Sequence, residues 1–340
     1  MDEQIIANLA TRYTRFAEME VHGRSPSYEA LARGVAGDRE VLSFLMTLPK
    51  DKRQPNLLLA AMRHLFGTSL DWDHFRRTLL INPDPVRSVM LTRSTQTNEP
   101  ARCATLLPVL ARLPQPLALI EVGASAGLCL LPDFYGYDYA RTQIRPATIE
   151  TEPPVFTCRV SETTPVPTAM PEIVWRAGLD LNPLDAADPA QAEWLKTLVW
   201  TEQTARLAQL RAALKIAAVR KPRVMKGDLL GDRLQQLCRE APKSATLVIF
   251  HTAVLAYVAD QAKRQAFADQ VMLLCQYWVS NEAPSVFPEA ASRARGRGAP
   301  GRFLLCVNGA PVAWTDPHGV ALEWIAWPDR ITANQGPNAG

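Results

Sequence analysis

The segment whose spacing is most suggestive of chemistry is ALIEVGASAGL, residues 118–128, in which an apolar run ends in a glycine-rich turn. Gly123, Ser125 and Gly127 fit the pattern G-x-S-x-G, in which a sharp turn after a strand exposes a nucleophilic serine. Together with Glu121, the two glycines also fit an acidic, glycine-rich turn whose backbone can approach a bound nucleotide closely. The segment therefore predicts either a nucleophile or a ligand-binding turn.

Polar residues also close the other apolar runs that we expect to form strands. In an open sheet of parallel strands, ligands bind outside the carboxyl ends of the strands, so these residues are expected along one edge. The segments that contribute to this edge are distant in sequence, and their closing residues are Glu121, Asp180 with Asn182, Gly227 with Asp228, His251 with Thr252, and Asn281 with Glu282.

The elements that would position these residues change type after about residue 112. Up to that point apolar residues recur at three-to-four spacing, which predicts a helical region. Beyond it, short apolar runs alternate with helical segments, which is typical of a parallel sheet covered on both faces. We expect an α/β protein with a helical region at 1–112, a doubly wound, mostly parallel sheet domain at 113–330 with antiparallel strands near its end, and a tail at 331–340.

The expected strands of that sheet follow from the apolar runs and the turn residues between them. Helices are expected from Asn98 or Glu99 to about Arg112, and after Asp188, which we place as an N-cap with Pro189 at the first helical position. The proline-rich segment 132–171 is expected to be irregular. The strands are expected at 117–122, 172–181, 223–228, 245–251 and 277–280, followed by an antiparallel meander at 303–307, 312–315 and 320–327.

Three motifs, EVGASAG, GLDLNP and KGDLL, occur in an order that resembles the cofactor site of class I S-adenosylmethionine-dependent methyltransferases. The resemblance implies a Rossmann-like fold in which the glycine turn and the following helix N-terminus approach the cofactor. A carboxylate at the second strand end would accept the ribose hydroxyls, and one at the third the adenine amino group. The implied cofactor-binding residues are Glu121, Gly123, Ala124, Ser125, Gly127, Asp180, Asn182, Gly227, Asp228 and Leu229.

Two features depart from that pattern. Ser125 stands where those enzymes usually carry a central glycine, and Asp180 follows the glycine turn later in the chain than their second acidic residue does.

Longer blocks spread over nearly the whole chain are RSPSYEALARGVAGD, RQPNLLLAAMRHL, TQTNEPARC, EVGASAGLCLLPDFYGYDY, GLDLNPLD, WLKTLVWTEQTARLAQLRAAL and ATLVIFHTAVLAYV. In this order they resemble the bacterial domain of unknown function 2332 family. That resemblance implies a grouping with Rossmann-like methyltransferase folds and no particular activity.

Two residues after the fourth expected strand, His251 and Tyr257, stand where transfer chemistry sits in the methyltransferases that the chain resembles. An imidazole is well suited to act as a general base on a hydroxyl or amine near neutral pH. An equally weighted alternative is a strand-end histidine held by structural hydrogen bonds. The residues expected to bind the substrate or to close the site are Gln96, Asn98, Glu99, Arg102, Asn281 and Glu282.

Two other functions stay open at the level of sequence. A serine hydrolase would use Ser125 with His318, which follows Asp316 in a late loop and preserves the chain order serine, acid, histidine. A non-catalytic protein would instead sense an adenosyl ligand, or bind a protein partner through the helical region.

Composition narrows the expected partners. A net charge of +3, from 37 basic and 34 acidic residues, indicates neither a nucleic-acid nor a membrane partner and leaves a small-molecule substrate. The six cysteines are far apart and form no C-x-x-C pair, so no metal site or disulfide framework is expected. An acidic N-terminus and the lack of a long apolar run predict a soluble cytoplasmic protein. Nothing in the sequence specifies the oligomeric state or the methyl acceptor.

Overall fold

The structure, a computed structural model, describes residues 3–68, 71–96, 98–147, 152–296, 298–327 and 333–334. By its internal contacts the chain forms two compact units. The first consists of Met1–Thr97 and Ala190–Ala208, and the second of Asn98–Pro189 and Gln209–Gly340. The return of 190–208 to the first unit is absent from the division predicted from sequence. Of the predicted tail at 331–340, all but residues 333–334 lie outside the described residues.

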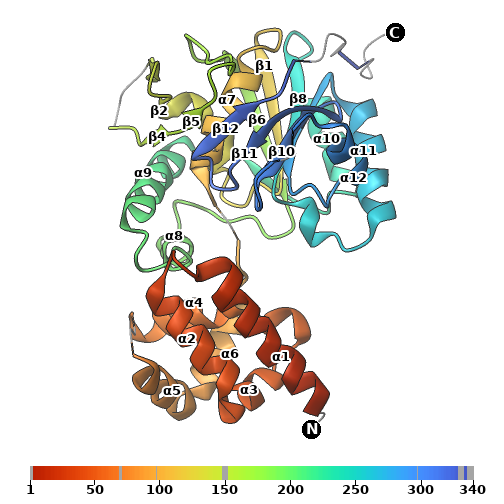
Figure 1. Cartoon of the computed structure of the whole chain (residues 1–340). Helices are drawn as coiled ribbons and strands as arrows, with labels where there is room; N and C mark the ends of the chain where they lie inside the picture. Colours follow the sequence, from red (N-terminus) through yellow and green to blue (C-terminus); the bar gives the residue numbers. More distant parts are fainter. Residues whose placement is uncertain are drawn as a thin grey trace. The chain divides into compact units, whose positions relative to one another are not determined.

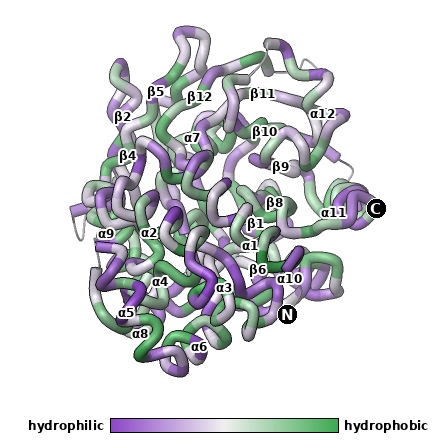
Figure 2. Tube along the Cα trace, turned by 60° about the horizontal axis from the view of Figure 1, so that its bottom comes forward, coloured by the Kyte–Doolittle hydropathy of each residue, from purple (hydrophilic) through white to green (hydrophobic). Residues whose placement is uncertain are grey.

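The first unit is helical, as its three-to-four spacing of apolar residues predicts. Its helices bury one side each in a shared core, and Trp194 from the returning segment lies in that core. Figure 2 shows hydrophilic and hydrophobic stretches alternating along these helices. The elements are α1 (Glu3–Arg15), a π-helical turn η1 (Phe16–Val21), α2 (Pro26–Gly37), α3 (Arg39–Met46), η2 (Lys50–Lys52), α4 (Pro55–Phe66), α5 (Trp72–Ile81), α6 (Pro83–Thr92) and α8 (Pro189–Thr197).

Side-chain caps define where several of these helices begin. The Ser25 hydroxyl accepts a hydrogen bond from the Tyr28 amide, and Pro26 occupies the first position of α2. Asp38 caps α3 by accepting from two amides, and Asp71 caps α5 by accepting from the His74 amide. Each cap satisfies amide groups that the helix itself leaves unbonded.

The second unit is built on a nine-stranded sheet with the order β5-β12-β11-β10-β9-β8-β1-β6-β7. The pairs that join β7, β6, β1, β8 and β9 are parallel, and those that join β9, β10, β11 and β12 are antiparallel. The strands are β1 (Leu117–Val122), β5 (Arg159–Val160), β6 (Ile173–Asp180), β7 (Val224–Lys226), β8 (Thr246–Thr252), β9 (Tyr277–Glu282), β10 (Phe303–Val307), β11 (Ala310–Thr315) and β12 (Ala321–Trp324).

Helices cover both faces of this sheet. Figure 1 shows α10 (Arg233–Glu240), α11 (Gln261–Leu274) and α12 (Pro288–Arg293) together on one side. Alternate residues of β1, namely Ala118, Ile120 and Val122, share a hydrophobic core with α10 and α11. Because strand side chains alternate between faces, Leu119 and Glu121 belong to the opposite face. The remaining helices of the unit are η3 (Pro100–Arg102), α7 (Cys103–Leu110), η4 (Leu128–Leu130), η5 (Pro132–Phe134) and η6 (Leu255–Tyr257), while α9 (Thr204–Arg220) begins in the first unit and ends in the second.

Two expectations about this unit are wrong. The proline-rich segment 132–171 is not irregular throughout: it forms a small sheet of β3 (Gln143–Ile144), β2 (Gly136–Asp138) and β4 (Val155–Thr157), and supplies the edge strand β5. Buried aromatic residues from these strands, Tyr137 and Phe156, pack together and explain why the segment folds. The other correction concerns the glycine turn, which leads into the 3₁₀ turn η4 rather than into an α-helix.

Candidate functional site

The candidate site lies where the direction of chain progression across the sheet reverses. Apart from the short edge strand β5, the chain passes from β1 to its neighbour β6 and then outward to β7. It then crosses to β8 on the other side of β1. Adjacent connections leave β1 and β8 in opposite directions, and it is at such a point, outside the carboxyl ends of the strands, that open α/β sheets bind their ligands. The glycine turn begins at this point, directly after Val122.

The turn approaches both neighbouring strands closely. Gly123 has a φ of +74°, and its amide donates to the Leu179 carbonyl at 2.7 Å. A Cβ at this position would lie 2.3 Å from a Val254 methyl group, so glycine is required by conformation and by space. Gly127, with a φ of +69°, and Ser125, with a φ of +50°, are also left-handed. The turn is therefore a strained, close-packed loop.

Asp180 fastens this loop to β6. One carboxylate oxygen accepts from the Ser125 amide at 2.8 Å, and the other accepts from the Asn182 amide at 2.7 Å. The second bond is the local turn that an aspartate often makes with its own backbone two residues on. Asp180 thus holds the backbone of the glycine turn, and Asn182 itself is exposed.

Asn98 closes the turn from the opposite direction. Its amide nitrogen donates to the Ser125 hydroxyl at 2.8 Å, and its carbonyl oxygen accepts from the Ala126 amide at 3.1 Å. In a nucleophile elbow the serine hydroxyl and the amide of the next residue face the substrate, as nucleophile and oxyanion donor. Here one side chain binds both, and the α-helix that follows such an elbow is replaced by η4.

Glu121 lies beneath the turn with a carboxylate that the fold leaves unused. The residue is 4% exposed, and its Oε2 atom has no hydrogen-bond partner within the part of the chain that the structure describes. Burial raises the pKa of the Glu121 carboxyl well above its ordinary value; Cys129 and Asp180 add to the rise, and Arg102 opposes it. A buried carboxyl of this kind costs stability unless a partner reaches it.

Glu99 and Arg102 connect this face of the sheet to the loop after β11. Arg102 is buried and donates to the Pro317 carbonyl at 2.8 Å and to the Thr252 carbonyl and hydroxyl at 3.0 and 3.2 Å. Glu99 Oε2 lies 3.4 Å from His318 Nδ1, an ion-pair distance. The structure therefore brings Asn98, Glu99 and Arg102 to the glycine-turn side of the sheet.

His251 lies on the other face. Its Nδ1 atom is 2.7 Å from Glu282 Oε1, and its Nε2 atom accepts from the Trp278 indole at 3.0 Å. Because the indole nitrogen only donates, Nε2 carries no proton and Nδ1 is the donor to Glu282. Both ring nitrogens are thus used internally, and the ring packs edge-on against Phe267 of α11. Of the two roles that the sequence allows for His251, a general base or a histidine held by structural hydrogen bonds, these contacts correspond to the second.

Glu282 and Asn281 point to different faces, as neighbours on a strand must. Glu282 Oε1 also accepts from the amides of Val254 and Leu255 at 2.8 and 3.1 Å, so it holds the loop after β8. Asn281 is fully buried, and its carbonyl oxygen accepts from the Thr315 hydroxyl at 2.7 Å. Glu282 therefore lies on the face of the sheet covered by α11, and Asn281 lies on the opposite face, which carries Arg102.

The other predicted residues lie at the rim. Tyr257 is 73% exposed in η6, directly after the loop that Glu282 holds. The Gly227 amide donates to the Asp180 carbonyl at 2.9 Å, and the exposed Asp228 accepts from the Leu230 amide at 2.9 Å, while Leu229 is half-buried between them. Gln96 belongs to the helical unit, not to the sheet unit that carries the glycine turn.

Sequence reasoning missed two contributors, Trp278 as the donor to His251 and Val254 against Gly123, and although it placed Thr252 at this edge it did not foresee that Thr252 accepts from Arg102. The alternation of strand side chains was the available signal for Trp278 and Thr252, because it places Trp278 on the face of His251 and Thr252 on the other. No local pattern marks Val254, whose contact depends on how two loops meet.

Two general properties bear on the chemistry. Within the part of the chain that the structure describes, no group of three or more histidine, cysteine, aspartate or glutamate side chains is arranged to hold a metal ion. In the same part, no helix has both the length and the apolar composition needed to cross a membrane.

The fold and this edge define a mixed α/β protein with a mostly parallel sheet, a glycine turn at its topological switch point and a helical unit. The chain belongs to the family described as "Uncharacterized protein conserved in bacteria (DUF2332)", whose model matches residues 10–324. No curated protein matches it. A similar solved structure is the crystal structure of a possible exported protein from Bordetella parapertussis, at 13% identity and a TM-score of 0.27, covering 84% of this chain and 73% of that one.

Proposed function

We propose that the sheet unit binds S-adenosylmethionine at the glycine turn and transfers its methyl group to a small molecule. The observation that carries this proposal is the buried Glu121 carboxylate, whose Oε2 atom lacks a partner at the carboxyl end of β1. A ligand that brings a positive charge or hydrogen-bond donors to this point would supply the missing interaction.

The order of the parallel strands supports a Rossmann-like assignment. Numbered in chain order, β7-β6-β1-β8-β9 follows the sequence 3-2-1-4-5 of doubly wound nucleotide-binding sheets. The sheet departs from that plan after β9, because β10, β11 and β12 continue as an antiparallel meander. The departure leaves the switch point between β1 and β8 intact.

The residues at this point fit such a ligand in part. S-adenosylmethionine would supply an electrophilic methyl group on a positively charged sulfur. A bound sulfonium would favour the ionised form of the Glu121 carboxyl and pair with it, and the turn from Gly123 to Gly127 would bring backbone close to the ligand. Asp180 serves mainly to fix the turn, since both of its oxygens accept backbone amides.

Positioning of the acceptor would depend on the loop after β8. His251 donates to Glu282, and Glu282 in turn accepts from the amides of Val254 and Leu255, so the pair fixes the segment that carries Tyr257. His251 then acts as a positioning residue, whereas the exposed Tyr257 phenol is free to contact an acceptor. Proximity supplies much of the rate in such a transfer, so only a modest base is needed.

Calorimetric titration of the full chain with S-adenosylmethionine and S-adenosylhomocysteine tests the proposal. Glu121→Gln keeps the size of the side chain and removes its ability to ionise beside a bound cation, so affinity for the sulfonium cofactor should fall by about tenfold or more. Glu240→Gln, on the surface of the same unit, serves as the matched control. Absence of binding by the unmodified protein, or equal affinity in Glu121→Gln, would overturn the proposal. Binding without turnover on any acceptor would instead favour a non-catalytic adenosyl sensor.

A serine hydrolase is the second candidate, and two observations favour it. Ser125 is left-handed, as an exposed nucleophile can be, and the Glu99–His318 pair resembles the acid and base of a triad. Against it, Asn98 binds both the Ser125 hydroxyl and the following amide. Ser125→Ala separates the two functions: it would abolish hydrolysis of any ester substrate completely, but would reduce adenosyl binding only slightly.

A further inference from the structure

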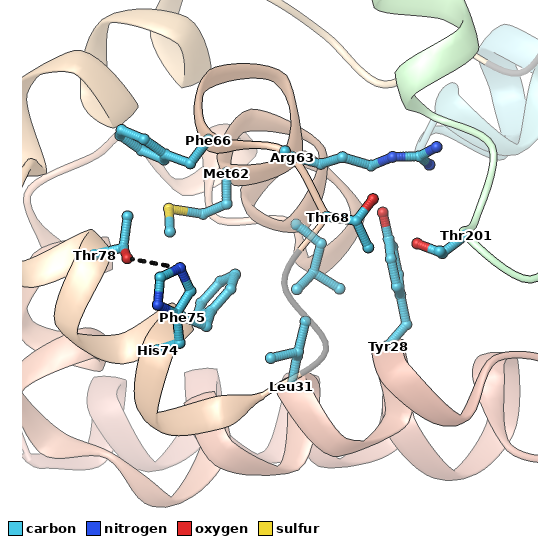
Figure 3. Close-up of a pocket in the computed structure, with 12 residues that line it drawn as sticks. Tyr28, Leu31, Met62, Arg63, Phe66, Thr68, His74, Phe75, Thr78 and Thr201 are labelled. Carbon is cyan, nitrogen blue, oxygen red and sulfur yellow. Dashed lines mark hydrogen bonds between the residues drawn. The ribbon is translucent and has the colours of Figure 1, made fainter.

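The helical unit contains a pocket of its own, formed by α2, α4, α5 and the segment between α8 and α9 (Figure 3). The pocket is partly open, and its empty volume of about 370 Å³ includes open solvent at its mouth. Its base is apolar and buried, and consists of Leu31, Leu59, Met62 and Phe75. Phe66 and His74 form part of an exposed rim. The pocket thus offers an apolar surface that could contact the apolar part of a ligand, below an entrance that is partly polar.

Two hydroxyl groups in this pocket have no acceptor for their protons among the described residues. Tyr28 is 4% exposed, and the only side chain that hydrogen-bonds its buried phenolic oxygen is the Arg63 guanidinium, which is a donor; the hydroxyl of Thr201 is buried and has no partner among these residues. Figure 3 shows the hydroxyl end of Tyr28 between the side chains of Thr68 and Thr201. Buried polar atoms are normally bonded, because each one left unpaired costs stability. Two such atoms lining one pocket indicate a ligand rather than a packing fault.

Arg63 explains how Thr201 reaches this position. Its guanidinium donates to the Val199 carbonyl, which fastens the segment before α9 onto α4. Two residues later, Thr201 closes the pocket over Tyr28. The polar end of the pocket is therefore assembled by a specific interaction within the unit.

The electrostatic balance at this end favours an anion. Burial raises the pKa of the Tyr28 phenol, so the hydroxyl stays protonated and can donate. Of the two charged side chains that act on it, Arg63 has a stronger effect than Glu202. The Glu202 oxygens are already bonded by the Ser25 hydroxyl at 2.5 Å and by the Ser27 amide and hydroxyl at 3.0 and 2.7 Å.

We infer that this pocket binds a small monocarboxylic acid with an apolar body, whose carboxylate accepts hydrogen bonds from Tyr28 and Thr201 beside Arg63. The apolar body would contact Leu31 and Phe75 at the base. The inference concerns the helical unit alone and does not depend on methyl transfer in the sheet unit.

Titration of the full chain with benzoate, followed by calorimetry or ligand-observed NMR, tests the inference. Benzamide has the same ring and nearly the same shape without the charge, and it should bind at least about tenfold more weakly, because a hydrogen bond to a charged group is the stronger one. Tyr28→Phe and Thr201→Val each remove one hydroxyl with little change in shape, and each should weaken benzoate binding by about tenfold.

Tyr13→Phe is the matched control, because it removes another buried phenolic hydroxyl of the same unit that does not line the pocket. It should leave benzoate binding unchanged, and both tyrosine variants should melt at or above the temperature of the unmodified protein. The inference fails if benzoate does not bind, if benzamide binds equally well, or if Tyr28→Phe and Thr201→Val bind benzoate as tightly as Tyr13→Phe does. Those results would assign the pocket to bound water alone.

Discussion

Two buried carboxylates lie near the carboxyl ends of parallel strands in the same sheet, and the fold treats them differently. Glu282 accepts from His251 and from two backbone amides through a single oxygen, on the face covered by α11. The Oε2 atom of each residue lacks a partner among the described residues, but Glu121, on the other face below the glycine turn, accepts no hydrogen bond from any described group through its other oxygen either. A polar side chain at a strand end therefore does not by itself mark a ligand site. What matters is whether other groups of the protein already hydrogen-bond to it.

The largest effect is expected from removing the carboxylate that the fold uses. Glu282→Ala leaves the two loop amides and the His251 donor unbonded in a buried environment, so the free energy of unfolding should fall by about 3 kcal/mol or more. Denaturant unfolding measures this loss. Glu240→Ala, which removes an exposed carboxylate of α10, should change stability little. An equally small loss for Glu282→Ala would show that the two faces do not differ in this way.

Gly123→Ala should have the next largest effect. The new Cβ would overlap a Val254 methyl group at 2.3 Å and would place alanine at a φ of +74°. We expect a loss of about 2–3 kcal/mol in the free energy of unfolding. Adding Val254→Ala relieves the overlap but not the backbone strain, so the double variant should recover only part of the loss. Full recovery would mean that conformation plays no role at this turn.

Asn98→Ala should cost about 1–2 kcal/mol of unfolding free energy, because the Ser125 hydroxyl and the Ala126 amide each lose a partner. Ser125→Ala removes one of the same bonds. Losses in the double variant should therefore be smaller than the sum of the two single losses, which a double-mutant cycle detects. Additive losses would contradict a direct bond between Asn98 and Ser125.

The free energy of unfolding of Glu121→Gln should equal that of the unmodified protein in acid and should exceed it increasingly as the pH rises. Since burial raises the pKa of the Glu121 carboxyl in the folded protein, the folded state holds its proton at a pH where the unfolded state has lost it. Stability of the unmodified protein then declines as pH rises above the unfolded value, whereas Glu121→Gln escapes this decline. Unfolding free energies of both proteins between about pH 4 and pH 8 measure the difference. A constant difference across that range would show that Glu121 titrates normally.

The sequence predicts the sheet of this protein well because its strands are short, apolar and bounded by turn residues. The strands at 117–122 and 303–307 have the predicted limits, and β6, β8 and β9 differ by a few residues. The small sheet within 132–171 escaped prediction because its strands are only two or three residues long and are stabilised by distant aromatic packing. The packing of α8 into the helical unit likewise depends on the burial of Trp194 in that unit's core. No local sequence pattern predicts this burial.

In the candidate site, too, some properties follow from the local sequence and others depend on residues distant in the chain. Its composition was predictable, since polar residues close each parallel strand. What each residue does was not, because the bonds of Asp180 and His251 depend on side chains from other strands and loops. For the glycine turn, the sequence indicates left-handed backbone but cannot show that Asn98 occupies the Ser125 hydroxyl.

Hydrogen–deuterium exchange of the full chain, with and without S-adenosylhomocysteine, tests the contrast between the two faces most directly. If the ligand binds at the Glu121 side, amides at 121–127 should exchange more slowly in its presence, while those of β9 and α11 should exchange at unchanged rates. Glu121→Gln should lose the protection at a ligand concentration that protects the unmodified protein. Protection confined to α11, or to the helical unit, would contradict the assignment of the glycine turn as the ligand site.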